Sequence, residues 1–170
     1  MTLDEFLNGI LDPGLVFVAT LDPEILPTPD VRRFLLTVAQ QESGPKLDAR
    51  YQGSPSNSPG PARGWWQFEQ SGGVAGVMQH AASKEQVMLA CRVLHIHFQS
   101  AAIWRALEGH DTLSVCFARM LLRTDTHPVP TNAADGWKCY ADRLWRPGKP
   151  HPETWQGNWD AAAAAVQVNP

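Results

Sequence analysis

Hydrophobic residues along most of the chain recur at the three- and four-residue spacing of an amphipathic helix. The clearest case follows Thr28, where one face carries Val31, Phe34, Leu35, Val38 and Ala39. Thr28 is a suitable N-cap, Pro29 suits the first helical position, and Gly44-Pro45 ends the segment. We therefore predict a helix that begins at Pro29 and ends just before Gly44.

The same periodicity predicts helices elsewhere in the chain. A short helix over 2–12 and a longer one over 83–109 each open on a capping box, and Asp-Pro-Gly ends the first. Segment 112–122 is hydrophobic nearly all round, which is typical of the buried centre of a helical domain. Residues 132–145 give a further amphipathic helix. The apolar segment 14–20 fits either a strand or a buried helical turn.

One stretch interrupts the helical pattern. Residues 44–64 are rich in Ser, Pro and Gly and predict a loop, and 64–69, Gly-Trp-Trp-Gln-Phe-Glu, predicts a short extended or turn element. No internal repeat is visible. We expect a mainly α fold with a small irregular or β insert, built as a single domain over 1–170 with an N-terminal extension (1–29), a core (30–150) and a C-terminal tail (151–170).

Composition narrows the function classes. The chain has 170 residues, of which 44% are hydrophobic, enough for one sizeable core. The net charge of −3 and the lack of a basic patch argue against a nucleic-acid partner. No apolar run approaches the ~20 residues of a membrane span, and acidic residues stand where a signal peptide needs Lys or Arg. We expect no signal peptide and no stable membrane insertion.

The cysteines and histidines do not predict a disulfide framework or a metal centre. Cys91, Cys116 and Cys139 are odd in number and far apart, which fits reduced thiols. Cys91 and His95 share a helix face, but His97 points away from them, and no CxxC or HExxH motif is present. No phosphate-binding glycine loop occurs either. We expect no metal and no cofactor.

Glu42 breaks the pattern of the predicted 29–43 helix. It continues the stripe of Val31, Leu35 and Val38 at spacings of four, three and four, so a carboxylate stands where a buried hydrophobe is expected. Partial burial and the negative end of the helix dipole would both raise its pKa. A carboxylic acid protonated near neutral pH can act as a general acid. The alternative is a frayed last turn that exposes Glu42 to water.

The segments around Glu42 resemble the lysozyme-like superfamily, in particular soluble lytic transglycosylases and phage muramidases. In that family a helix ends in Glu-Ser, a loop follows, and a Gly-x-x-Gln segment lines a sugar cleft. Here these residues are Glu42-Ser43 and Gly64 to Gln67, and Tyr140 stands where such enzymes often have a tyrosine bonded to the catalytic acid. The family's Ala-Tyr-Asn-Ala-Gly-like segment is not present as such.

The resemblance implies a phage-encoded, peptidoglycan-degrading enzyme, an endolysin or virion-associated lysin. It would cleave the β-1,4 bond between N-acetylmuramic acid and N-acetylglucosamine, with Glu42 as general acid and base. It implies substrate contacts for Ser43, Trp66, Gln67 and Tyr140. Three of these residues have a structural alternative: Gln67 can be an amide bonded to loop backbone, Tyr140 can be a core residue, and only one of the two adjacent tryptophans is expected on the cleft.

The sequence leaves two mechanisms open, which differ in whether a second carboxylate takes part. A hydrolase uses one as nucleophile or base, whereas the resemblance implies that a transglycosylase uses the substrate's own 6-hydroxyl. The candidates are Asp48, Glu69, Asp111 and Asp125, and Glu69 is favoured because it adjoins Gln67. A non-catalytic glycan-binding or virion structural protein is the alternative function, and chitin the alternative substrate. We expect a monomer, unless part of a virion, that is made in a host cytoplasm and acts on the periplasmic wall through a membrane lesion or from a virion.

Overall fold

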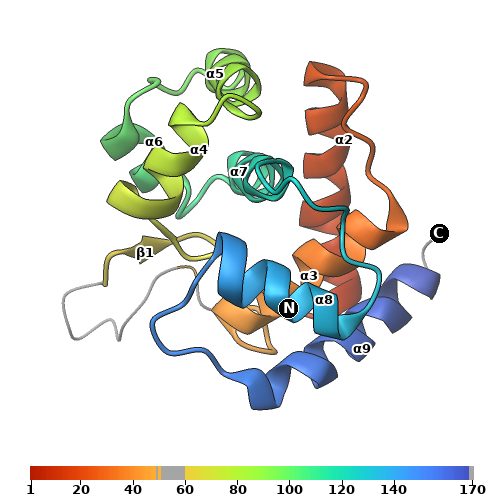
Figure 1. The fold of residues 1–170 in the computed structure, drawn as a ribbon. Helices are drawn as coiled ribbons and strands as arrows, with labels where there is room; N and C mark the ends of the chain where they lie inside the picture. The colour runs from red at the N-terminus through yellow and green to blue at the C-terminus, as the bar shows by residue number, and fades with distance from the viewer. Residues whose placement is uncertain (49, 51–59, 169–170) are drawn as a thin grey trace.

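Helices account for most of the computed structural model, which describes residues 1–48, 50 and 60–168 (Figure 1). A mainly α class is therefore confirmed. Three short segments, labelled η, are π-helices. In chain order the elements are α1 Leu3–Phe6, η1 Leu7–Leu11, α2 Asp12–Leu21, α3 Pro29–Ser43, β1 Ala62–Arg63, β2 Phe68–Glu69, η2 Gln70–Val74, α4 Ala75–Gln79, α5 Lys84–Val93, α6 Ser100–Ala106, α7 Asp111–Arg123, α8 Ala133–Trp137, η3 Lys138–Leu144 and α9 Pro152–Val168.

Helix α7 lies at the centre of the molecule, as its apolar sequence predicts. Figure 1 shows it between α2 on one side and the α4–α6 group on the other, and it also contacts α3. Every residue from Leu113 to Met120 is buried. A helix that is apolar nearly all round must be covered on several sides, and α2, α3, α4, α5 and η1 all pack against α7.

The prediction that Asp12-Pro13-Gly14 ends the first helix is wrong. The chain stays helical from α1 through η1 into α2, so the ambiguous segment 14–20 is a helix. Pro13 lies directly after the π-helical segment η1, at the junction with α2, and the chain stays helical on both sides of it. Phe6, Leu11 and Val18 are fully buried, so residues 1–29 contribute to the core and are more than an extension.

The predicted long helix over 83–109 is also wrong, because it divides into α5 and α6. His95 adopts a left-handed backbone (φ +56°) just after α5, which ends the helix. The expected capping box at Ser83 does not form either. The buried Ser83 hydroxyl donates to the Val77 carbonyl, and the Gln86 amide donates to Asp22. Tertiary partners have replaced the local cap.

Helix α3 has the predicted bounds and lies beside α9 (Figure 1). The insert after it contains a short antiparallel pair, β1 and β2, with Arg63 opposite Phe68. Part of the predicted 44–64 loop, residues 49 and 51–59, lies outside the described residues. The described cysteines are free and buried, and within 1–48, 50 and 60–168 no helix combines the length and apolarity needed to cross a membrane.

Candidate active site

A cleft of about 760 Å³ opens where the end of α3, the β1–β2 pair and η3 meet. The wall is completed by the segment 145–151 that links η3 to α9. Most of the residues predicted from the sequence line this cleft although they are up to 98 positions apart: Glu42, Trp66, Gln67, Glu69 and Tyr140. Ser43 is the predicted site residue that does not.

Glu42 lies in the last turn of α3, with most of its side chain removed from water. The Tyr140 hydroxyl donates a hydrogen bond of 2.7 Å to its Oε1. Burial raises the pKa of Glu42 to about 7, and the bond from Tyr140 opposes that rise only in part. Burial and the neighbouring Glu42 raise the pKa of Tyr140, so the phenol stays protonated and remains the donor. Glu42 thus holds a proton near neutral pH and faces a cleft.

Tyr140 is held from several directions. It lies in η3, a π-helical turn, and the chain folds back so that the backbone N–H groups of Trp145 and Arg146 both donate to its carbonyl oxygen. Its ring stacks on Trp155 of α9, with centroids 5.1 Å apart and planes 14° apart. π-helical turns occur often at functional sites, where they displace a side chain from its usual helical position. Tyr140 is therefore a core residue whose hydroxyl bonds Glu42 at the cleft.

The Gly64–Gln67 turn contributes Trp66 and Gln67 to the cleft wall. Gly64 has a positive φ (+75°), and a Cβ there would lie 2.6 Å from the Ser114 hydroxyl oxygen, so only glycine fits. Its carbonyl accepts from both the backbone N–H (3.1 Å) and the side-chain amide (2.9 Å) of Gln67. Gln67 also has a positive φ (+48°), which is uncommon for this residue type. Its amide nitrogen is bonded to loop backbone, while the half-buried side chain lines the cleft.

Ser43 supports this wall from behind. It is buried, and its hydroxyl donates to the Trp65 carbonyl at 2.6 Å. The bond joins the end of α3 directly to the Gly64–Gln67 turn. The serine after the acid therefore orients the cleft wall, and the structure does not place it at the cleft surface.

The tandem tryptophans are core residues. Trp66 borders the cleft, but it is 0% exposed and its Nε1 donates to the Leu35 carbonyl. Trp65 is also buried and donates to Asp111. The prediction of a tryptophan ring from this pair that stacks on sugars is wrong, because a covered ring has no free face. Trp145, which is half-buried and donates to the Trp66 carbonyl, is the tryptophan that faces the cleft.

Only one of the four candidate second carboxylates lines the cleft. Glu69 is exposed there, at the end of β2. Asp48 is exposed elsewhere, and Asp111 accepts from Trp65 and pairs with Arg50. Asp125 is bonded within a separate cluster. If a second carboxylate takes part, it is Glu69.

Three basic side chains on the cleft wall were not predicted from the sequence. Arg146, Lys149 and His151 line the cleft in the segment after η3. Arg146 has a positive φ (+47°), and its Nε donates to the Asp142 carbonyl. In the part of the chain that the structure describes, neither Arg146 nor Lys149 has a carboxylate partner. The Pro- and Gly-rich sequence in this segment predicts the end of a helix, but it contains no signal that the segment lines a cleft.

The structure offers no metal centre among residues 1–48, 50 and 60–168, since no three His, Cys, Asp or Glu side chains gather in a suitable group. Cys91 is buried whereas His95 is exposed, so the pair does not form a common face.

Comparisons with known proteins add no relative: no family model matches the chain, no curated protein matches it, and no solved structure matches it. What can be inferred about function therefore comes from the sequence and from the geometry of the cleft.

Proposed function

We propose that the protein is a lysozyme-like, peptidoglycan-degrading enzyme that cleaves the β-1,4 bond between N-acetylmuramic acid and N-acetylglucosamine. The observation that carries this proposal is Glu42, a carboxylic acid with a pKa of about 7 that lines a cleft and accepts a hydrogen bond from Tyr140. An acid that is half protonated at neutral pH is suited to give a proton to a leaving oxygen.

Glu42 performs both proton transfers in the proposed reaction. It first gives its proton to the bridging oxygen, the glycosidic bond breaks, and positive charge develops at the muramic acid anomeric carbon. The 6-hydroxyl of the same sugar then bonds to that carbon and returns its proton to Glu42. The product carries a 1,6-anhydro ring, no water is consumed, and Glu42 is again protonated. Tyr140 donates to the carboxylate throughout and stabilises it in the charged state.

Glu69 defines the alternative chemistry. It is the candidate second carboxylate on the cleft, so it would serve as base or nucleophile if water replaced the 6-hydroxyl. The enzyme would then be a muramidase that leaves reducing ends. We favour the transglycosylase because the Glu42-Ser43 and Gly64–Gln67 segments resemble that family, in which one carboxylate is sufficient.

The basic wall, which is the part of the cleft lined by Arg146, Lys149 and His151, favours peptidoglycan over chitin as the substrate. Both polymers are β-1,4 glycans of N-acetylated sugars, but only peptidoglycan carries a lactyl-linked peptide with carboxylates. Arg146 and Lys149 line the cleft without carboxylate partners among the described residues, so they can attract such groups. Trp145 on the same wall offers an aromatic surface to a sugar ring.

A non-catalytic glycan-binding or virion structural protein is the second candidate. A pure binder would gain nothing from a largely buried carboxylic acid, because burying that group costs free energy. We therefore favour the enzyme. The glycan strand is its proposed partner, and a membrane lesion or a virion is its proposed route to the periplasmic wall.

The proposal is tested with the Glu42→Gln variant on purified peptidoglycan and, in parallel, on chitin. Glutamine keeps the shape and can still accept from Tyr140, but it has no acidic proton to give. We expect wild type to clear peptidoglycan in preference to chitin, and the variant to clear neither. Glu85→Gln, an exposed glutamate in the first turn of α5, is the matched control and should behave as wild type. Equal clearing by both variants would exclude Glu42 as the acid.

A further inference from the structure

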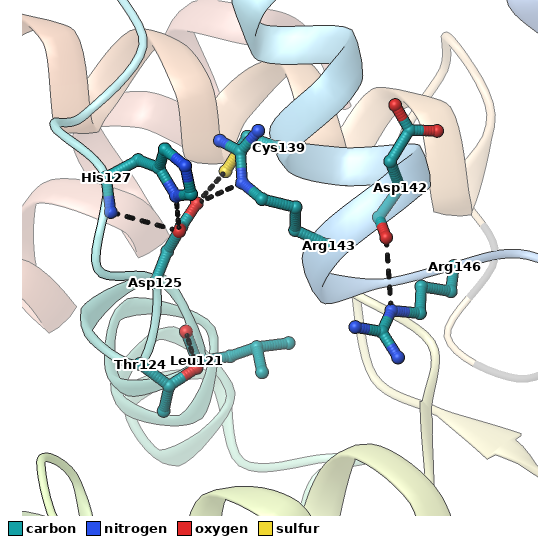
Figure 2. Close-up of polar contacts among 8 residues, drawn as sticks. All are labelled: Leu121, Thr124, Asp125, His127, Cys139, Asp142, Arg143 and Arg146. Carbon is teal, nitrogen blue, oxygen red and sulfur yellow. Dashed lines mark hydrogen bonds and ion pairs between the residues drawn. The ribbon is translucent and has the colours of Figure 1, made fainter.

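A polar cluster built around one carboxylate, Asp125, lies beside the helical turn that carries Tyr140 (Figure 2). At its centre is Asp125, whose side chain is only 5% exposed. Its carboxylate accepts from Arg143 Nε (2.8 Å), from the Cys139 thiol (3.4 Å) and from the backbone N–H of His127 (3.1 Å), and the His127 ring lies 2.7 Å away. Burial disfavours the charge, but the bonds from Arg143 and His127 outweigh it and lower the pKa of Asp125 to about 2. Asp125 is therefore an anion at any physiological pH.

The partners of Asp125 flank Tyr140 along the chain. Cys139 immediately precedes Tyr140 and Arg143 follows three residues later, and both lie in η3. Figure 2 shows Cys139 and Arg143 pointing from this helix toward Asp125, which lies in the turn after α7. One carboxylate thus joins the central helix of the fold to both ends of the turn that carries Tyr140.

This turn depends on its surroundings for its geometry. A π-helical turn is less favourable than an α-helical one and persists where tertiary contacts hold it. The Tyr140 hydroxyl is at the far end of a long ring, so a small rotation of η3 about its axis moves the hydroxyl by a larger distance. The 2.7 Å bond to Glu42 therefore requires that the rotation of η3 be fixed.

We propose that Asp125 is a positioning residue that, through Cys139 and Arg143, fixes the rotation of η3 and so aims the Tyr140 hydroxyl at Glu42. Asp125 does not line the cleft. Its importance for catalysis rests on the proposed function of Glu42. Its effect on the protonation of Glu42 does not, and this effect is what we would measure.

The test compares the pKa of Glu42 in wild type, Asp125→Asn, Tyr140→Phe and the double variant. The readout is the ¹³C NMR titration of the Glu42 carboxyl, assigned by its absence in Glu42→Gln. Because the bond from Tyr140 lowers the pKa of Glu42, we expect Tyr140→Phe and Asp125→Asn each to raise it above the wild-type value of about 7. The double variant should match Tyr140→Phe, since the second change has no bond left to weaken.

Asp12→Asn is the matched control. Asp12 forms a two-bond ion pair with Arg32 (2.8 and 2.6 Å). Arg32 lies in the first turn of α3, ten residues before Glu42, so the two residues are roughly 15 Å apart along the helix. This variant should lower the melting temperature without moving the pKa of Glu42. The other charged or titratable groups that line the cleft are unchanged in all of these variants: Glu69, Arg146, Lys149 and His151.

Two results would overturn the proposal. One is an unchanged Glu42 pKa in Asp125→Asn while Tyr140→Phe raises it, and the other is an equal rise in Asp12→Asn. If Asp125→Asn does not fold, Arg143→Gln removes the charged donor from the half-exposed side of the cluster and should produce the same rise. A failure of wild type to cleave glycans would overturn the proposed function alone, because the NMR titration needs no activity.

Discussion

Two carboxylates contact the same helical turn, η3, and have opposite properties. Glu42 has a pKa raised to about 7, whereas the pKa of Asp125 is lowered to about 2. Burial acts on both in the same direction. The difference lies in the donors: Asp125 accepts from a guanidinium and three further groups, while Glu42 accepts, among the described residues, from a single neutral phenol. A carboxylate withdrawn from water becomes a structural anion or a proton donor according to its partners.

The largest effect expected from this contrast is on activity. Glu42→Gln should lower the rate of glycan cleavage by about 10²–10⁴, the usual contribution of general acid catalysis. In wild type the rate should fall as the pH rises through about 7, because the protonated form of Glu42 is then lost. Measurement of initial rates from pH 5 to 9 checks both statements. A rate that stays constant across pH 7 would contradict the assignment of the acid.

The next effect is on stability: Glu42→Gln, which should lower activity, should make the fold more stable at neutral and alkaline pH. Because folding raises the pKa of Glu42 from 4.5 to about 7, the folded state holds more protons in that interval, and wild type loses stability as the pH rises through it. The Glu42→Gln variant does not lose this stability, because the glutamine side chain does not titrate. Its free energy of unfolding relative to wild type should increase by roughly 2–3 kcal/mol between pH 4.5 and 8. Urea denaturation at the two pH values measures the difference, and a constant difference would mean that Glu42 is an ordinary exposed carboxylate.

Asp125→Asn should destabilise the fold by about 1–3 kcal/mol at pH 7, because the donors around a buried acceptor lose their charged partner. Folding lowers the pKa of Asp125, so its stabilisation is complete above the usual carboxyl value and is lost as the pH falls toward about 2. Wild type and variant should therefore converge in acid. Denaturation curves that remain separated at pH 2 would assign the loss to packing and not to charge.

A smaller effect is expected from the basic wall. Lys149→Ala should lower the rate on peptidoglycan by about two- to tenfold and leave the rate on chitin oligosaccharides unchanged, since only peptidoglycan supplies carboxylates. Added salt should reduce the difference between variant and wild type. Lys84→Ala, at the exposed start of α5, is a suitable control. An equal loss on both substrates would mean that Lys149 does not recognise charge.

The smallest effect is expected at Glu69. If Glu42 carries both proton transfers, Glu69→Gln should retain most of the wild-type rate even though the residue lines the cleft. A loss as large as that of Glu42→Gln would instead identify a hydrolase with two catalytic carboxylates.

The sequence predicts well those features that depend on neighbours in the chain. Helix α3 has the predicted bounds because its N-cap, Pro29 and Gly44 are local signals, and the place of Glu42 on the apolar stripe follows from periodicity. Tyr140 was associated with the acid only through the resemblance to a family, since no local pattern relates residues 98 positions apart. For residues 64–69 an extended or turn element was predicted, and Gly64–Gln67 is a turn. The burial of both tryptophans was not predicted, because Phe6, which packs against both rings, comes from a distant part of the chain.

The failures share a cause. Pro13 does not end its helix, because the chain passes from the π-helical segment η1 directly into α2. The Ser83 hydroxyl does not cap α5, because it donates to the Val77 carbonyl instead. The basic wall and the Asp125 cluster join residues from different elements, so only the folded chain brings them together.

The most direct test of the central claim is mass spectrometry of the soluble products from purified peptidoglycan. We predict that wild type releases disaccharide-peptides with 1,6-anhydro ends, each lighter by one water than the hydrolytic product, and that Glu42→Gln releases none. Reducing-end products alone would replace the transglycosylase with a muramidase and require Glu69. Equal release of glycan fragments by wild type and Glu42→Gln, or none by either, would contradict the claim that Glu42 cleaves the strand.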